Sequence, residues 1–271
     1  MSFERLAHPV LFAVLVVLAG CGSLGGTSPT VDDTVTPVPV PTDRETYPAG
    51  ISAAGVSPGV LVETHERRLA TTNYTFVSQQ RVVGPNGTMW VTNRSRQIAN
   101  EEGSYAGRID HRVVEFPLGR FSEPIEYWGN ESVYASRRIL SERTEFYGWQ
   151  RNTDPPRKLT SFPLMERSLE ATRLSVVDGR EGVTLVGSEL RWPDRLPNPP
   201  YLTDPRNVSV TVSVGDDGVV TRWRLAYDAT LVNESVRVTR EARLTDVGET
   251  TVRRPGWVDT ARAQFESSQD D

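Results

Sequence analysis

Three histidines and a single cysteine are the side chains of this chain that could best support nucleophilic, acid–base or metal chemistry. A Ser/His/Asp triad would have to use His8, His65 or His111, and no nucleophile-elbow glycine pattern accompanies them. His8 precedes an apolar run, His65 is expected on an exposed helix side, and His111 follows Asp110 in a solvated pair. The sequence also has no cysteine cluster, EF-hand loop, phosphate-binding glycine loop or dinucleotide fingerprint. We therefore expect no catalytic residue, no metal site and no cofactor, in a protein that is not an enzyme.

Cys21 lies one residue, Gly20, beyond a run of ten apolar residues, Val10–Ala19. This run is shorter than the roughly 20 residues that cross a bilayer, so it fits a secretory signal. Leu18-Ala19-Gly20-Cys21 resembles a lipobox, in which the chain is cut before a cysteine whose thiol then becomes a lipid thioether. We expect a signal peptide at residues 1–20 and lipidation of Cys21. The alternative is a chance cysteine in a signal that is uncleaved or conventionally cleaved.

Residues 22–50 are rich in Thr, Pro and Gly and show no apolar periodicity. Such a segment cannot bury enough surface to offset the entropy lost on ordering. We expect residues 21–50 to form a disordered tether that begins at the lipidated cysteine and carries one domain, residues 51–271. The predicted location is the cell membrane, with a lipid anchor and the domain on the extracellular side. The threonines either carry O-linked sugar or belong to a plain solvated linker.

The charge and composition limit the classes of partner. The formal net charge is -5, so there is no overall basic surface and we expect no nucleic acid. Lys158 is the only lysine among 30 basic residues, a ratio typical of a high-GC genome, and the 35 acidic residues are compatible with a halophile.

The domain begins with a helix signal and continues with period-two alternation. Ser57 and Pro58 mark the start of a short helix, and the first strand follows from Tyr74 to Val82. Asn86-Gly87 predicts a hairpin turn, because this pair accepts positive φ, and Met89 begins the return strand. Further strands are predicted near 105–116, 133–134 and 145–149, after a turn at 127–131.

A helix at about 162–172 separates these strands from a second series. Strands are predicted at 174–177 and 183–187, then a proline-rich loop at 192–205, then the valine-alternating strand Asn207–Val214. Asp216-Asp217-Gly218 predicts the next turn, two more strands follow, and a short helix follows Trp257. Sequential hairpins predict an α+β domain whose large antiparallel sheet has one apolar face. We expect this sheet to curve, with two or three helices on its concave face.

The lipobox, the Thr-Pro tether and Asn73-Tyr74-Thr75-Phe76 form a recognisable set with the closing stretches 218–223, 246–252 and 255–257. Together these segments resemble an uncharacterised family of haloarchaeal lipoproteins. The fold that this resemblance implies is similar to the half-barrel of lipoprotein carriers such as LolA and LppX, in which a curved sheet and inner helices enclose a hydrophobic cavity. The resemblance brings no catalytic residue with it.

The resemblance favours a binding module for a hydrophobic or amphipathic ligand, for example a lipid, near the membrane surface. Aromatic residues could line its cavity or could be ordinary core: Tyr74, Phe76, Trp90, Tyr105, Trp128, Tyr134, Trp223 and Tyr227. The alternative function is a structural or interaction protein of the cell envelope that contacts a surface-layer or exported partner.

Six Asn-X-Ser/Thr sequons could carry N-linked glycan on an exported domain. Their asparagines are Asn73, Asn86, Asn93, Asn130, Asn207 and Asn233. We expect at least one to be modified, and the alternative is that these asparagines serve turns.

Overall fold

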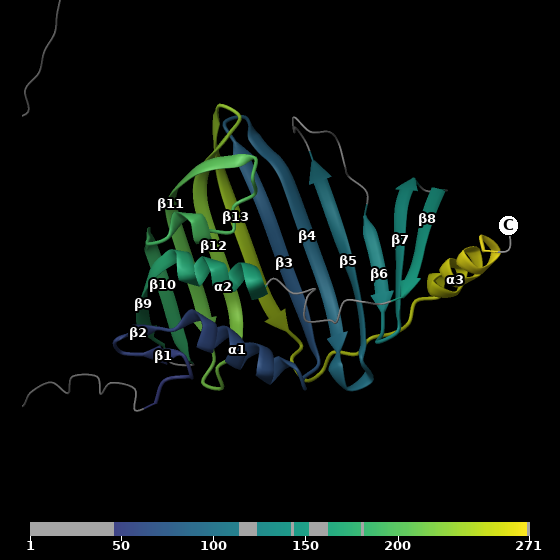
Figure 1. Cartoon of the computed structure of the whole chain (residues 1–271), viewed down its shortest axis with the longest axis horizontal. Coiled ribbons are helices and arrows are strands. Elements are labelled where there is room, and N and C mark those ends of the chain that lie inside the picture. The colour runs from purple at the N-terminus through teal and green to yellow at the C-terminus, as the bar shows by residue number, and fades with distance from the viewer. Residues whose placement is uncertain (1–45, 114–123, 142–143, 152–161, 180–181, 270–271) are drawn as a thin grey trace, which may run out of the picture. The chain divides into compact units, whose positions relative to one another are not determined.

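The computed structural model describes residues 46–113, 124–141, 144–151, 162–179 and 182–269, which all belong to one compact unit (Figure 1). The predicted signal peptide, Cys21 and nearly all of the predicted tether lie outside the described residues.

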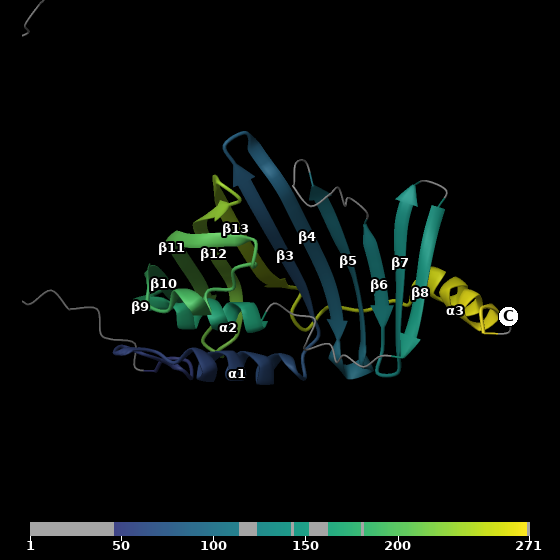
Figure 2. The same cartoon turned by 45° about the horizontal axis from the view of Figure 1, so that its top comes forward.

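The main feature of the described residues is one antiparallel sheet of eleven strands (Figures 1 and 2). Its spatial order is β8-β7-β6-β5-β4-β3-β13-β12-β11-β10-β9. The strands are β3 (Tyr74–Gly84), β4 (Gly87–Ala99), β5 (Ser104–Val113), β6 (Ile125–Gly129), β7 (Val133–Ser141), β8 (Thr144–Arg151), β9 (Thr172–Asp178), β10 (Val183–Leu190), β11 (Leu202–Val214), β12 (Val220–Leu231) and β13 (Glu234–Thr245). Strands β8 and β9 end the sheet without pairing to each other, so the sheet is an open half-barrel. The predicted α+β class and large antiparallel sheet are confirmed.

Hairpin turns fix the register where glycine supplies a positive φ. Gly87 has φ of 116° between β3 and β4, and Gly218 has φ of 84° between β11 and β12. Both turns were expected from Asn86-Gly87 and Asp216-Asp217-Gly218. Two predictions were wrong in extent. Residues 127–129 belong to strand β6 rather than to a turn, and β11 begins at Leu202, inside the predicted loop.

The two faces of the sheet carry different helices. We call inner the face that packs against α1 (Pro58–Leu69) and α2 (Phe162–Ala171), which lie over β9–β13 and β3 (Figure 1). We call outer the opposite face, which packs against α3 (Trp257–Ser267) at strands β7 and β8. Two small strands, β1 (Ile51–Ser52) and β2 (Gly55–Val56), and two 3-10 turns, η1 (Asn100–Glu102) and η3 (Pro193–Arg195), complete the described elements.

The large core lies on the inner face, where alternate residues of each strand meet the helices. Leu61 and Leu69 of α1 and Leu169 of α2 are almost fully buried, in the same core as the valines of β11. The Asn100 side-chain amide donates hydrogen bonds to the carbonyls of Leu69 and Thr72, at 2.7 Å and 2.6 Å. It thereby satisfies backbone groups that the end of α1 leaves unpaired.

A smaller core fixes α3 to the outer face. Trp128 and Ala135, which are paired in register across β6 and β7, pack against Val258 and Ala261 of α3. The Arg254 guanidinium lies 5.6 Å from the centre of the Trp128 ring. Because Tyr127 faces the inner core, the next residue must face outward, which places Trp128 under α3.

Candidate ligand-binding face

Three arginines share the inner face with the apolar core. On β4, the inner positions alternate from Trp90 through Arg94 and Arg96 to Ile98. Arg240 of β13 is in register with Gln80 of β3, which is itself in register with Thr92 of β4; Arg240 therefore lies two strands from β4 on this face. We call Arg94, Arg96 and Arg240 the inner arginine cluster.

The inner arginine cluster is buried with little compensation. Arg96 is 6% exposed and Arg240 8%, and Arg94 is partly buried. Among the described residues, no ion pair with a carboxylate is found for these three side chains. Arg96 Nη1 and Arg240 Nε are buried without any hydrogen-bond partner, as is Ser78 Oγ next to Arg94 in register. Buried charges are usually paired, so this arrangement is costly in the absence of an anion.

The pKa shifts of Arg94 and Arg240 reflect the same excess of positive charge. Burial lowers the pKa of Arg94, and the neighbouring Arg96 and Arg240 lower it further. Burial also lowers the pKa of Arg240, with Tyr227 and Tyr201 opposing the change and Arg167 adding to it. The guanidinium groups remain cationic at neutral pH because their ordinary pKa is so high. The site therefore holds concentrated positive charge in a region of restricted solvation.

Phenols surround the cluster as additional hydrogen-bond groups. The Arg96 Nε–H donates to Tyr127 Oη at 2.7 Å, and the guanidinium carbon lies 5.4 Å from the centre of that ring. Burial raises the pKa of Tyr227 to about 12, although Arg240 opposes the change. Burial likewise raises the pKa of Tyr127, again against the influence of Arg96. Both phenols stay protonated at neutral pH. The Tyr227 hydroxyl donates its proton to Asn198 Oδ1 at 2.9 Å, whereas the Tyr127 hydroxyl accepts from Arg96 and keeps its own proton for an oxyanion.

Gly107 makes the approach of Arg96 and Tyr127 possible. It lies between them in register, Arg96 with Gly107 and Gly107 with Tyr127. A Cβ at this position would collide with the Tyr127 hydroxyl and with the backbone oxygen of Ser95. The absence of a side chain lets the Tyr127 ring cross β5 and reach Arg96.

The predicted cavity aromatics do not all lie on one face. Six are buried in the inner core, namely Tyr74, Phe76, Trp90, Tyr105, Trp223 and Tyr227. Tyr134 is partly buried and stacks on Tyr127 at 6.2 Å between ring centres. Trp128 lies on the outer face under α3. Phe76 and Trp223 border a small space of about 20 Å³.

The inner face continues past the helices with apolar residues. Ile109 and Ile125 are paired in register on β5 and β6, and both are only partly buried. Leu140 is 41% exposed and Phe146 is 57% exposed on β7 and β8. Figures 1 and 2 show α1 and α2 over the other half of the sheet. The apolar surface next to the inner arginine cluster is therefore partly open, as far as the described elements show.

The two histidines in the described ranges, His65 and His111, both make hydrogen bonds within the fold. The expectation for His65 was wrong: it is 1% exposed, its Nδ1 accepts the N–H of Val220 at 3.0 Å, and its ring meets Phe162 edge-on at 4.3 Å. The helix pattern placed His65 outward because it lies among charged residues, but α2 and the start of β12 cover it. His111 Nδ1 lies 3.0 Å from Thr92 Oγ1 on the inner face. No group of three or more His, Cys, Asp or Glu suited to a metal occurs in the part of the chain that the structure describes.

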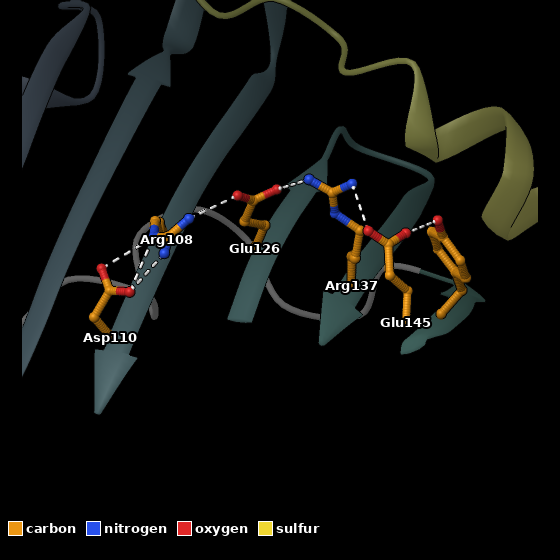
Figure 3. A network of polar contacts seen from close by, with 6 residues as sticks. Arg108, Asp110, Glu126, Arg137 and Glu145 are labelled. Carbon is orange, nitrogen blue, oxygen red and sulfur yellow. Dashed lines mark hydrogen bonds and ion pairs between the residues drawn. The ribbon is translucent and has the colours of Figure 1, made fainter. Parts of the chain in front are cut away.

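On the outer face of β5–β8, in contrast, a row of charged residues is paired. Arg108, Glu126, Arg137 and Glu145 line up across β5–β8 with contacts of 3.0, 2.6 and 3.3 Å (Figure 3). Asp110 contacts Arg108 at one end, and Tyr147 donates to Glu145 at the other. Because every charge here has an opposite neighbour, the network stabilises strand pairing and leaves no reactive group.

A groove of about 650 Å³ lies beside α2 and β9, and two of its three arginines, Arg173 and Arg195, are paired with carboxylates. Arg195 pairs with Glu170 at 2.8 Å, and Arg191 lies over the ring of Trp192 at 5.7 Å. We therefore place the candidate site at the inner arginine cluster rather than in this groove.

The sequons are at different kinds of position. Asn86, Asn93, Asn207 and Asn233 are exposed. Asn93 accepts a hydrogen bond from Gln79 at 2.8 Å, and Asn207 donates to Asp228 at 2.7 Å. Asn73 and Asn130 are partly buried, and the Asn130 side-chain oxygen accepts from the backbone of Ser132 and Val133. Asn86 and Asn233, at hairpin tips, offer the most open acceptors.

Sequence reasoning missed the inner arginine cluster. The available signal was the parity of its residues: Arg94 and Arg96 occupy the same alternate positions as Trp90 and Ile98, which marks them as facing the core.

Comparisons with known proteins give no family assignment. A scan against protein-family models found no match, and a search of curated proteins found none either. Of the helices in the described ranges, none is both long and apolar enough to cross a membrane.

Proposed function

We propose that this protein is a non-enzymatic binding module whose inner face takes an amphipathic ligand near a membrane surface. The observation that carries the proposal is the inner face itself, on which partly open apolar residues of β5–β8 adjoin a buried group of uncompensated arginines. An amphipathic ligand supplies an apolar part for the first surface and a polar end for the second.

The location belongs to the same proposal. The lipobox-like segment at Cys21 would anchor the mature chain, and the Thr/Pro/Gly-rich segment would let the domain stand off the membrane. A two-chain lipid gives stable anchoring, whereas one chain gives only marginal binding. A domain held there meets membrane lipids at high local concentration. Sequons on exposed turns agree with an exported, glycosylated domain.

Native mass spectrometry of the full chain purified from its own membrane tests the binding function. We expect a bound species of lipid-like mass on the wild-type protein. Ile125→Glu places a charge on the apolar part of the inner face and should abolish this species. Phe265→Glu makes the same kind of change on α3, where the phenyl ring is 38% exposed, and should preserve it. Consistent absence of a bound species from wild-type protein would contradict the proposal.

A further inference from the structure

The inner arginine cluster has a charge that nothing in the described structure balances. Buried arginine ordinarily lies against a carboxylate. Even the more exposed outer-face residues Arg108 and Arg137 pair with Glu126. The groups that act on the pKa of Arg94 and Arg240 are other arginines and tyrosines, with no carboxylate among them. Two guanidinium nitrogens in more than nine-tenths buried residues, Arg96 Nη1 and Arg240 Nε, have no partner.

The chemistry of the cluster selects the kind of group that would satisfy it. Guanidinium forks match the oxygens of phosphate and carboxylate, and they form strong charge-assisted hydrogen bonds to them. Three arginines from β4 and β13, with the Tyr127 phenol and the Ser78 hydroxyl nearby, offer more positive charge and more donors than a single carboxylate requires. A phosphate group, with up to two negative charges and several free oxygens, balances more of this positive charge and accepts more of these hydrogen bonds.

Resting on the proposed function, we propose that Arg94, Arg96 and Arg240 form the binding site for the phosphate group of an anionic amphiphile whose apolar chains lie along the inner face of β5–β8. The phosphate oxygens accept hydrogen bonds from Arg96 Nη1 and Arg240 Nε, which now lack partners. Arg94, between them, contributes charge. The apolar residues Ile109 and Ile125 follow Arg94 in the same cross-strand row, which continues through the exposed Arg138 to Phe146.

Titration calorimetry of the purified full chain with three probes tests this site. The probes are inorganic phosphate, dihexanoyl phosphatidic acid and dihexanoylglycerol. The phosphatidic acid has both a phosphate group and acyl chains, inorganic phosphate has no chains, and dihexanoylglycerol has no phosphate. We expect the phosphatidic acid to bind at least about ten-fold more tightly than either other probe, because charge-assisted hydrogen bonds and apolar burial then act together.

The variant pair Arg94→Met and Arg240→Met removes charge but keeps much of the side-chain volume. In the double variant we expect the affinity for phosphatidic acid to fall by at least about ten-fold. Arg243→Met is the matched control, because Arg243 is on the same strand but exposed on the outer face. It should change the affinity by less than about two-fold.

Thermal unfolding without ligand separates a binding role from a structural one. If the arginines serve a ligand, removing unbalanced buried charge should leave the melting temperature of the double variant unchanged or higher. A large fall in the melting temperature would show that the arginines hold the fold together, and would overturn the proposal.

The remaining outcomes distinguish this site from the proposed function. Binding of phosphatidic acid and dihexanoylglycerol with equal affinity, unaffected by the double variant, would overturn the phosphate site and leave the amphipathic binding function standing. Binding of inorganic phosphate as tight as that of phosphatidic acid, lost in the double variant, would support an anion site but contradict the apolar part of the ligand. If none of the three probes binds, the phosphate site is overturned. The proposed binding function is decided separately, by whether native mass spectrometry finds a lipid on the protein from its own membrane.

Discussion

The imidazole of His65, on α1, is buried against Phe162 and the start of β12, and this burial determines its protonation state. Desolvation lowers the pKa of His65 from its ordinary value to about 4, although the charge of Asp217 opposes the change. The neutral ring is also required by its hydrogen bond, because Nδ1 accepts from the Val220 amide. His65 therefore acts in folding and not in acid–base chemistry.

This burial predicts a loss of stability in mild acid. In the unfolded chain, His65 is protonated below about pH 6.5. In the folded protein, it stays neutral until the pH falls to about 4. Stability from this group is thus complete above pH 6.5 and falls as the pH drops toward 4, by roughly 3 kcal/mol at most. Urea unfolding of wild type and His65→Gln between pH 7 and 5 measures it.

The slope of the free energy of unfolding against pH, compared between wild type and variants, separates the contribution of His65 from that of other titrating groups. His65→Gln lowers stability at pH 7 but should remove most of the pH dependence between 7 and 5. Burial and the charge of Arg94 also lower the pKa of the half-buried His111, so His111→Gln should reduce the slope as well, but by less than His65→Gln does. Equal slopes in wild type and His65→Gln would contradict the assignment.

Gly107 is the second residue whose role is local. Gly107→Ala forces its Cβ against the Tyr127 ring and the Ser95 carbonyl, so the strand or the ring must shift. We expect a loss of roughly 2–3 kcal/mol in the free energy of unfolding. Gly256→Ala is the control, since nothing lies within 4 Å of its added Cβ, and should change stability by less than about 0.5 kcal/mol. Urea unfolding gives both values, and similar values would refute the packing argument.

Among the elements, strands β5–β8 depend on side-chain pairing across the outer face. Glu126 contacts both Arg108 and Arg137, at 3.0 Å and 2.6 Å, and its side chain is only 23% exposed. A carboxylate with two partners is held with less entropy cost than an isolated surface pair. This residue is the centre of the network drawn in Figure 3.

Glu126→Gln should therefore lower the free energy of unfolding by about 1 kcal/mol, with a smaller loss at high salt. Glu63→Gln is the control, because Glu63 pairs only with Arg67 on an exposed turn of α1. It should cost less than about 0.5 kcal/mol. Chemical unfolding at low and high ionic strength gives the comparison. A larger effect at Glu63 would show that the network has no stabilising role.

Element prediction from sequence succeeded where local signals were strong. The alternating valines of Asn207–Val214 and the Asn86-Gly87 turn specify a strand and a hairpin by local physics alone. Residues 127–129 were misjudged because Gly129 resembles a turn residue, whereas in the sheet it makes room for the Tyr105 ring. That requirement comes from β5, which sequence patterns cannot place. The arginine cluster was missed for a related reason, since Arg240 meets Arg94 only through the pairing of β13 with β3.

At the scale of the whole domain, the two halves of the sheet are supported differently. Strands β10–β13 and β3 pack on the inner helices and hold most of the large core. Strands β6–β8 depend on α3, on a core with few buried residues, and on the outer-face charges. Local opening is governed by the buried contacts that it breaks. The half that carries the open apolar surface is thus also the half with less support.

Hydrogen exchange followed by mass spectrometry should reveal this asymmetry. Amides of β11–β13 should exchange only through global unfolding, and those of β7 and β8 should exchange faster through local opening.

If the inner face binds an amphiphile, dihexanoyl phosphatidic acid should slow exchange in β4–β6 more than in β10 and β11, because ligand binding stabilises the closed state of the strands that it touches. Uniform exchange across the sheet would contradict the division into halves. Protection confined to β10 and β11 would instead place the ligand beside α2, in the groove where Arg173 and Arg195 are paired with carboxylates.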